Sequence, residues 1–600
     1  MDFQKPARWL RAAVLLPVLA LGLAACDDDD DNPMEPTGPG NLAEVAADDA
    51  RLSRLVAALE AAGLDETLQG PGPYTVFAPG NPAFDPPALP EGWADNLLLP
   101  ENEDLLDRIL KYHVVQGQVM STDLTDGQEI TTVEGSTLTV GIDGGNITLT
   151  DASGNEVGVV DADIEASNGV LHIIEYVLLP ELDAVEVAQI AGYGTLVALV
   201  EEAGLTETLQ GEGPFTIFAP SDDAFDGIVA PEGDDLSDLL KYHVIQGEAL
   251  ESGELTNGQV LTTVQGEDLT IGVDAPQDAP VTVTVTDANG NTWEVVEPNL
   301  VASNAVIHGI EGVLLPEADI PTVAGLYGYS SLVNSVEAAG LAETLQGDGP
   351  FTVFAPSNAA FEATPTQLPS EGDLLEQFLN YHVVPGEYLA SDLTDGQELP
   401  TVEGSIITVG INEETGAVTV TDAAGNVANV EVADIRTSNG VIHGVDAVLV
   451  PSLSIPVLAS YNGFSSLVDA LVAAPAPGGG TLAELLGDEA DYTVFAPTNE
   501  AFEAFGTLPE GEDLTRVLLY HVLAVEEGIV DSGSLEARDY DTEQGDYITV
   551  SIDAPQDGIA TVTLTDGLGN TATVTAVDII AKNGVIHVID AVIQPATEPR

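Results

Sequence analysis

The chain has very few basic residues and a single cysteine. Only 13 of its 600 residues are lysine or arginine, against 100 aspartates and glutamates, and the formal net charge is −87. A field of this sign repels nucleic acid and anionic lipid headgroups, so neither is expected as a partner. Because Cys26 is the only cysteine, no intramolecular disulfide can form. Repulsion between so many carboxylates destabilises a compact fold unless salt screens it. The acidic excess and scarce lysine resemble proteins of halophiles, so we hypothesise a salt-rich habitat.

The only long apolar run lies at the N-terminus. Residues 12–25 follow Lys5, Arg8 and Arg11 and end directly before Cys26. The run is too short to span a bilayer as a helix, which needs about 20 residues. Its pattern predicts a signal peptide over residues 1–25. The sequence Leu-Ala-Ala-Cys at 23–26 resembles a bacterial lipobox, which makes Cys26 the expected lipidation site. We therefore expect an exported protein, lipid-anchored to the cell envelope at the outer membrane and exposed on the surface. The alternative for Cys26 is a small buried core residue.

An acidic segment follows the cysteine. Five aspartates occupy positions 27–31, and residues 32–40 are rich in proline and glycine. Such a segment cannot bury apolar surface, so residues 26–40 are expected to be a disordered, self-repelling tether. Two interpretations stay open: a solvated spacer, or a signal for export to the surface.

A five-residue motif then recurs four times, roughly 140 residues apart. It reads TVFAP or TIFAP, at Thr75–Pro79, Thr216–Pro220, Thr352–Pro356 and Thr493–Pro497. The period is far longer than that of solenoid repeats, so each unit is expected to bury its own core. We predict four domains of one kind, over residues 41–180, 181–316, 317–451 and 452–600.

Each unit has the same order of local signals. An amphipathic helix opens it and ends at a glycine such as Gly63, except in the fourth unit, where residues 475–480 interrupt it. Thr195 is predicted to be the N-cap of this helix in the second unit. The residue two places after the TVFAP proline is predicted to be the N-cap of the next helix, at Asn81, Asp222, Asn358 and Asn499. Strands follow, separated by D-x-x-G-N turns such as Asp287–Asn291.

Three further motifs follow, one of which is replaced in the second unit. A helix ends in Tyr-His, at Tyr112-His113, Tyr242-His243, Tyr381-His382 and Tyr520-His521. Asp-Ile precedes Asn-Gly at Asp163-Ile164, Asp434-Ile435 and Asp578-Ile579, while the second unit has Asn299-Leu300. A second histidine follows, at His172, His308, His443 and His587.

Together with TVFAP, these motifs resemble fasciclin domains over residues 41–595. The resemblance implies an α+β fold, a wedge-like β-sandwich with packed helices, and a role in cell adhesion or matrix interaction. In animal members of the family the Tyr-His and Asp-Ile regions are implicated in integrin binding, so these residues are our candidate adhesion surface.

The histidines have two possible roles. A metal or acid/base site is one, but no HExxH motif, second ligand at i+4 or G-x-S-x-G elbow accompanies them. The other is a packed pair whose polar atoms satisfy backbone groups, and we favour it. We therefore predict no enzyme activity, catalytic residue, metal, cofactor or small-molecule substrate. The partner would be an unidentified cell-surface or matrix protein or polysaccharide. The alternative is an acidic structural envelope coat without a specific ligand.

Overall fold

A computed structural model describes residues 39–276, 280–364, 372–488, 490–553 and 561–596. The predicted signal peptide, the lipidation site Cys26 and nearly all of the tether lie outside these ranges. Among the described residues, no helix is long and apolar enough to cross a membrane. Two compact units can be separated, one of residues up to 84, 107–151 and 155–178, and the other of residues 85–106, 152–154 and 179–600. Each is described by itself.

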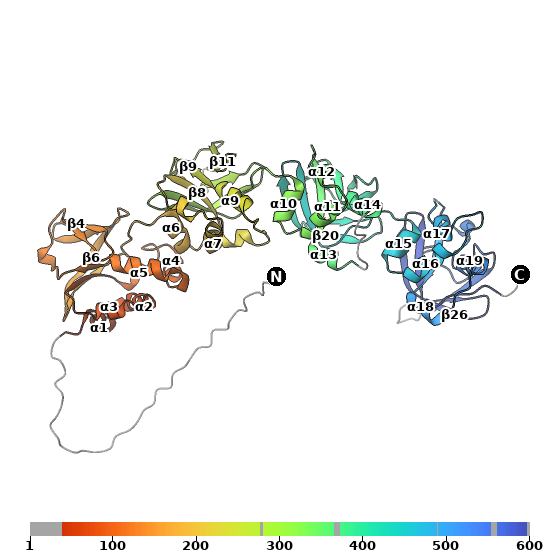
Figure 1. Ribbon diagram of the computed structural model, residues 1–600, viewed down its shortest axis with the longest axis horizontal. Helices are drawn as coiled ribbons and strands as arrows, with labels where there is room; N and C mark the ends of the chain where they lie inside the picture. Colours follow the sequence, from red (N-terminus) through yellow and green to blue (C-terminus); the bar gives the residue numbers. More distant parts are fainter. Residues whose placement is uncertain (1–38, 277–279, 365–371, 489, 554–560, 597–600) are drawn as a thin grey trace, which may run out of the picture. The chain divides into compact units, whose positions relative to one another are not determined.

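The four predicted domains repeat one order of elements (Figure 1). Domain 1 contains α1 (Leu42–Asp48), η1 (Ala50–Leu52), α2 (Ser53–Ala61), α3 (Asp65–Leu68), β1 (Tyr74–Pro79), η2 (Asn81–Phe84), α4 (Trp93–Leu97), η3 (Pro100–Asn102), α5 (Glu103–Tyr112), β2 (Val114–Gln116), η4 (Ser121–Asp123), β3 (Glu129–Thr131), β4 (Thr137–Asp143), β5 (Asn146–Thr150), β6 (Glu156–Ala166) and β7 (Gly169–Ile174). Domain 2 contains α6 (Ala184–Ala191), α7 (Gly194–Glu202), α8 (Thr206–Leu209), β8 (Phe215–Pro220), η5 (Asp222–Phe225), α9 (Asp234–Lys241), β9 (Val244–Gln246), β10 (Val260–Thr262), β11 (Asp268–Asp274), β12 (Thr282–Thr286), β13 (Thr292–Val301) and β14 (Ala305–Ile310).

The last two domains follow nearly the same order, but the sheet of domain 4 has six described strands, with an isolated bridge between Val494 and Val522 in place of the short strand that follows the Tyr-His helix in the other domains. Domain 3 contains α10 (Ile320–Leu326), α11 (Ser330–Ala338), α12 (Ala342–Leu345), β15 (Phe351–Pro356), α13 (Asn358–Glu362), α14 (Asp373–Tyr381), β16 (Val383–Pro385), η6 (Ala390–Asp392), β17 (Glu398–Pro400), β18 (Ile406–Ile411), β19 (Val418–Thr421), β20 (Val427–Thr437) and β21 (Gly440–Val445). Domain 4 contains α15 (Ile455–Tyr461), α16 (Ser465–Ala473), α17 (Leu482–Leu485), β22 (Tyr492–Pro497), α18 (Asn499–Phe505), α19 (Glu512–Leu519), η7 (Val525–Glu527), β23 (Asp539–Asp541), β24 (Tyr547–Asp553), β25 (Thr561–Thr565), β26 (Thr571–Ala581) and β27 (Gly584–Ile589).

One sheet organises each domain. In domain 1 the strand order is β2-β1-β7-β6-β5-β4-β3, and only the β1–β7 pair is parallel. The long strand β6 pairs with β5 through residues 156–158 and with β7 through residues 159–166. An isolated bridge between Val115 and Thr132 joins the two edges of the sheet. The sheet is therefore barrel-like, and with the helices packed on it the fold is α+β, as predicted.

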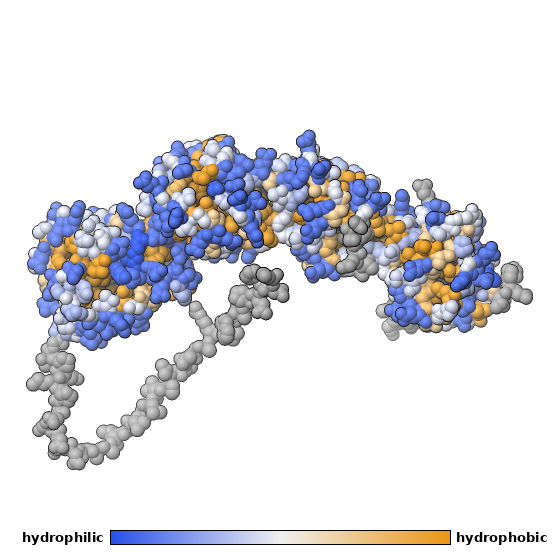
Figure 2. Space-filling model, in the orientation of Figure 1, coloured by the Kyte–Doolittle hydropathy of each residue, from blue (hydrophilic) through white to orange (hydrophobic). Residues whose placement is uncertain are grey.

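Apolar residues on the inner faces of strands and helices form the cores. Leu138, Leu149 and Phe77 are buried in domain 1, as are Leu55 and Leu59 of the opening helix α2. The visible surface of each domain is largely hydrophilic, with apolar residues between the polar ones (Figure 2). The prediction that a glycine ends the opening helix is confirmed, because the glycine itself has a left-handed backbone. Gly63 has φ 64° in domain 1, and Gly204 has φ 67° in domain 2.

The capping predictions were wrong in an instructive way. The N-cap after each TVFAP-type strand in domains 2, 3 and 4 is the residue one place earlier than predicted, Ser221, Ser357 or Thr498. The predicted caps instead reach back to the opening helix. Asn81 Oδ1 accepts from Arg54 N at 3.0 Å, and Asp222 Oδ1 accepts from Thr195 N at 2.8 Å. Thr195 is therefore not an N-cap but a capped residue. The equivalent bonds in the other domains join Asn358 to Ser331 and Asn499 to Ser466.

Candidate functional site

The tyrosine of each Tyr-His pair lies inside its domain. Tyr112, Tyr242, Tyr381 and Tyr520 all have 0% of their surface exposed. Their hydroxyls donate to backbone carbonyls of the following sheet, at Thr137, Asp268, Ile406 and Tyr547 respectively. Burial raises the pKa of each phenol that carries a resolved shift, as in Tyr242 and Tyr381. Each tyrosine therefore links the end of a helix to a strand of the sheet.

The histidine of each Tyr-His pair is equally enclosed. His113 Nδ1 lies 2.8 Å from Ile109 O, one helical turn earlier, and Leu178 N donates to His113 Nε2 at 2.9 Å. The ring is therefore neutral, with its proton on Nδ1. Burial lowers its pKa to about 4, because a charged ring would lose its hydration there. His243, His382 and His521 make the same two bonds, and burial lowers the pKa of each to about 4.

The second histidine of each domain has the opposite tautomer. Asp163 N donates to His172 Nδ1 at 3.1 Å, so His172 Nε2 carries the proton and donates to Val119 O at 2.9 Å. The ring stacks on Phe77, with centroids 5.6 Å apart. Among the described residues, no group of three histidine, cysteine or acidic side chains could hold a metal ion. Both nitrogens of each ring are thus already bonded to backbone groups.

The aspartate of each Asp-Ile motif sits at a strained bulge. Asp163, Asp434 and Asp578 have φ of 60° to 62°, and Asn299 has φ of 64°. Aspartate and asparagine tolerate this left-handed conformation better than other side chains. The carboxylate of Asp163 accepts from Ser121 N at 2.7 Å and from Ser121 Oγ at 2.5 Å. The bulge therefore fixes the start of η4, a short helix in the connection between β2 and β3.

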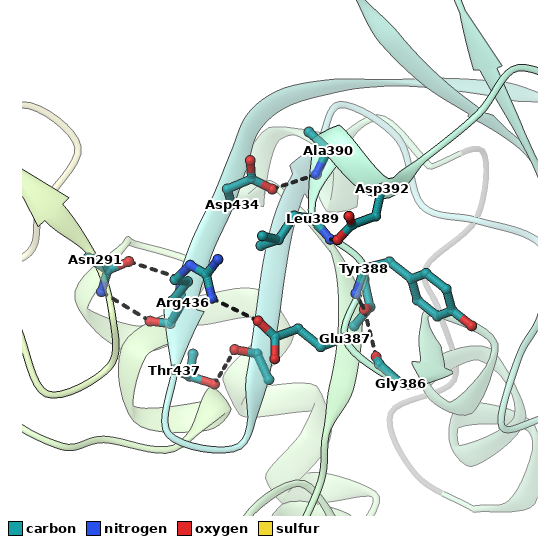
Figure 3. Close-up of polar contacts among 12 residues, drawn as sticks. Asn291, Gly386, Glu387, Tyr388, Leu389, Ala390, Asp392, Asp434, Arg436 and Thr437 are labelled. Carbon is teal, nitrogen blue, oxygen red and sulfur yellow. Dashed lines mark hydrogen bonds and ion pairs between the residues drawn. The ribbon is translucent and has the colours of Figure 1, made fainter.

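The same contact recurs in the other domains with small changes. Asp434 Oδ1 accepts from Ala390 N at 2.7 Å (Figure 3). Asp578 accepts from both Ser532 N and Ser532 Oγ. In domain 2, Asn299 Oδ1 accepts from Ser252 N, and its Nδ2 donates to Ser252 Oγ at 2.8 Å. The amide of Asn299 therefore replaces the carboxylate without changing the arrangement.

Exposure separates the two halves of the candidate adhesion surface. All eight Tyr-His side chains are buried, so a partner cannot touch them while the domain is folded. The prediction that the Tyr-His residues belong to the adhesion surface is therefore wrong. Their polar atoms form hydrogen bonds with backbone groups inside the domain. The aspartates remain accessible: Asp434 is exposed, and Asp163 and Asp578 are half-buried. Ile164 and Ile579 are half-buried as well, whereas Ile435 is only 4% exposed and belongs to a hydrophobic core.

Sequence reasoning missed a residue that joins several elements in each domain. The asparagine of the closing motif makes three bonds: Asn168 Oδ1 accepts from Leu42 N, and its Nδ2 donates to Leu68 O and Gly70 O, both at 2.7 Å. It thereby binds the first backbone amide of α1 and two carbonyls at the end of α3. The equivalent residues are Asn304, Asn439 and Asn583. The presence of asparagine at this position in all four units is the signal in the sequence that could have indicated this role.

These features define the class of protein. The model of the family described as "Fasciclin domain" matches residues 50–180, 191–316, 327–451 and 462–595, so the chain belongs to the fasciclin domain family.

Individual relatives come from animals and bacteria. Transforming growth factor-beta-induced protein ig-h3 of Sus scrofa is 30% identical over 510 residues, covering 81% of this chain and 69% of the relative. Periostin of Homo sapiens is 30% identical over 413 residues, covering 67% of this chain and 46% of periostin. Protein sll1483 of Synechocystis sp. is 45% identical over 141 residues, covering 24% of this chain and 74% of that protein. A solved pair of FAS1 domains from the insect cell adhesion molecule fasciclin I is 18% identical and covers 43% of this chain and 97% of its own, with a TM-score of 0.23, too low to support a structural argument.

Proposed function

We propose that the chain is a non-catalytic adhesion or matrix-interaction protein that uses several fasciclin domains at once at the cell surface. The observation that carries the proposal is the repetition, four times in one chain, of a domain shared with ig-h3 and periostin. One weak site per domain becomes effective binding when four are linked, because the later contacts form at a high effective concentration.

The state of the histidines supports a role without catalysis. A general base or metal ligand needs a ring nitrogen that is free to meet a substrate or an ion. Each of the eight rings has both nitrogens within hydrogen-bond distance of backbone groups, as in His113 and His172. The partner on this proposal is a cell-surface or matrix protein or polysaccharide.

In domains 1, 3 and 4 the part that we propose meets such a partner is the Asp-Ile bulge. Asp163, Asp434 and Asp578 keep part of their side chains at the surface, on a backbone that the serine or alanine contact holds in place. A fixed backbone loses little freedom when a partner binds, which favours affinity. The bulges, not the Tyr-His side chains, are therefore our proposed contact surface.

Clustering of coated beads tests the proposal. Beads carrying the mature chain are expected to cluster at physiological or molar salt, with each other or with matrix-coated beads. Beads carrying a chain shortened by its last three domains should cluster much less, because avidity is lost. Absence of clustering at every salt concentration would favour the acidic envelope coat, the alternative that the net charge of −87 suggests.

The anchoring and habitat parts of the proposal need separate tests. A Cys26→Ser variant is expected to leave the membrane fraction, and retention there would contradict lipidation at this residue. Protease treatment of intact cells should degrade a surface-exposed chain but spare a periplasmic one.

The melting temperature is expected to rise from low to molar salt, since screening relieves repulsion among the carboxylates. A flat melting temperature would remove the argument for a salt-adapted source.

A further inference from the structure

The D-x-x-G-N turn of domain 2 makes a contact that its position in the sequence did not predict. Asn291, the last residue of the turn, bonds twice to the main chain of Arg436 in domain 3 (Figure 3). Asn291 Oδ1 accepts from Arg436 N at 3.0 Å, and Asn291 Nδ2 donates to Arg436 O at 3.3 Å. The carboxamide thus pairs with the backbone of β20 as a neighbouring strand would.

The turn holds this carboxamide in a fixed orientation. Asn291 is 8% exposed, and its Nδ2 also donates to Asp287 Oδ2 at 3.0 Å. Asp287 is itself buried, and its carboxylate accepts from the backbone of Asn289, Asn291 and Leu315. Both amide protons of Asn291 are therefore used, one inside domain 2 and one on domain 3. A group oriented in advance loses little freedom when it makes a contact.

Strand β20, to which Arg436 belongs, has an edge that is not paired with another described strand. β19 pairs only with residues 427–429 of β20, so in the part of the chain that the structure describes no strand lies along the outer edge of residues 430–437. Arg436 N–H and C=O point from this edge to Asn291. The Arg436 side chain is held by Glu387, with Nη1 2.8 Å from Oε1, and a Cβ on Gly290 would lie 3.6 Å from its Cδ. This is an ordinary van der Waals distance, so the stem of Arg436 lies beside the turn.

We propose that the Asn291 carboxamide and the outer edge of β20 form an interaction surface that couples domains 2 and 3 into one rigid pair. Domains joined in one chain ordinarily move relative to each other unless their interface is substantial. Apolar contacts add to the two hydrogen bonds here, because Leu239, Val313 and Leu315 of domain 2 share a core cluster with Ile435 and its neighbours in domain 3. The coupled edge also leaves Ile435 covered, unlike Ile164 and Ile579.

The same turn in domain 4 provides a matched control. Asn570 makes the bonds that Asn291 makes within its own turn, to Asp566 Oδ1 and Oδ2. Its side chain has no described contact with a further domain. A substitution at position 570 therefore damages the turn alone, whereas the same substitution at position 291 damages the turn and the coupling.

Electron–electron distance measurements between two spin labels test the coupling in the full chain. The labels are attached to Glu207→Cys in domain 2 and Glu413→Cys in domain 3, both at exposed positions, in a chain that also carries Cys26→Ser. A narrow distance distribution is expected, and Asn291→Ala should broaden it clearly while Asn570→Ala leaves it unchanged. A broad distribution in the parent chain, or an unchanged one in Asn291→Ala, would overturn the proposal.

Hydrogen exchange of the Arg436 amide gives a second readout that does not depend on labels. Its protection is expected to fall at least about tenfold in Asn291→Ala, since the amide loses its acceptor and becomes an open edge position. Protection of amides in the core strand β15 should stay as it was, which shows that domain 3 is still folded. Unchanged exchange at Arg436 would mean that Asn291 does not hold the edge, and the coupling would be rejected.

Discussion

The Tyr-His helix end recurs in all four units and the Asp-Ile bulge in three, with Asn299-Leu300 in the second unit, yet the structure gives the two motifs different places. His113 has 1% of its surface exposed and bonds to backbone groups through both ring nitrogens. Asp163 is half-buried, has a left-handed backbone and keeps part of its side chain at the surface. Repetition alone therefore does not indicate a binding surface. A repeated residue can hold the fold together just as well, and the two cases differ in burial and in how many polar atoms are satisfied.

The largest effect is expected from removing a Tyr-His histidine. His113→Ala leaves the Ile109 carbonyl and the Leu178 amide without partners and opens a cavity, so we expect domain 1 to lose about 3–5 kcal/mol. Urea unfolding, monitored by hydrogen exchange of amides in domain 1, measures this loss. A loss below about 1 kcal/mol would contradict a structural role for the ring.

The pH dependence of stability should follow from the same ring. The pKa of His113 is about 4 in the folded domain and near 6.5 in the unfolded chain. The unfolded chain therefore binds a proton first as pH falls. The stability that the neutral ring contributes is complete above pH 6.5 and is lost as pH falls through 4, by up to about 3 kcal/mol per domain.

A matched variant isolates this contribution from other groups. Burial raises the pKa of Asp287 and of Asp422. The stability that these two carboxyls contribute therefore increases as pH falls, in the opposite direction to that of the histidines. The stability of the parent and of His113→Gln should therefore be compared at pH 7 and pH 4.5 in the same high salt. The parent is expected to lose more on acidification, and equal losses would show that the ring is not neutral in the fold.

A smaller effect is expected at the bulge. Asp163→Ala removes the two contacts to Ser121 and puts an alanine at φ 62°, which should cost about 1–3 kcal/mol. Thermal unfolding of domain 1 measures the cost. A result as large as that for His113→Ala would erase the distinction between the two regions.

The smallest effect is expected from Asp163→Asn. Asn299 makes the equivalent contacts to Ser252 in domain 2 at an almost identical φ, so this change should cost less than about 0.5 kcal/mol. The variant also removes one charge from the proposed contact surface. Bead clustering that weakens in Asp163→Asn, with stability intact, would indicate that the carboxylate itself meets the partner.

Much of the architecture could be predicted because its signals are local or repeated. The four TVFAP copies indicate four domains of one family, and Gly63 ends its helix as a left-handed residue should. The Tyr-His pairs were expected to satisfy backbone groups where helix meets sheet, and their geometry has this form.

The failures concern residues whose partners are distant in sequence. Asn81 is a residue type that is common at a local N-cap. Its side chain instead caps a helix that begins 28 residues earlier, at Ser53, as the bond from Arg54 N shows. Asn168 joins Leu42 to Leu68, and Asn291 reaches Arg436 in another domain. Capping and turn rules use only neighbouring residues, so they find the residue type but not the group that it bonds.

Nitrogen NMR of the histidine rings in the folded chain at pH 7 tests the central claim most directly. The account predicts four neutral rings with the proton on Nδ1, at His113, His243, His382 and His521, and four with the proton on Nε2, at His172, His308, His443 and His587. A Tyr-His ring that is protonated at pH 7, or that exchanges freely between tautomers, would contradict the claim that these pairs belong to the framework and not to the binding surface.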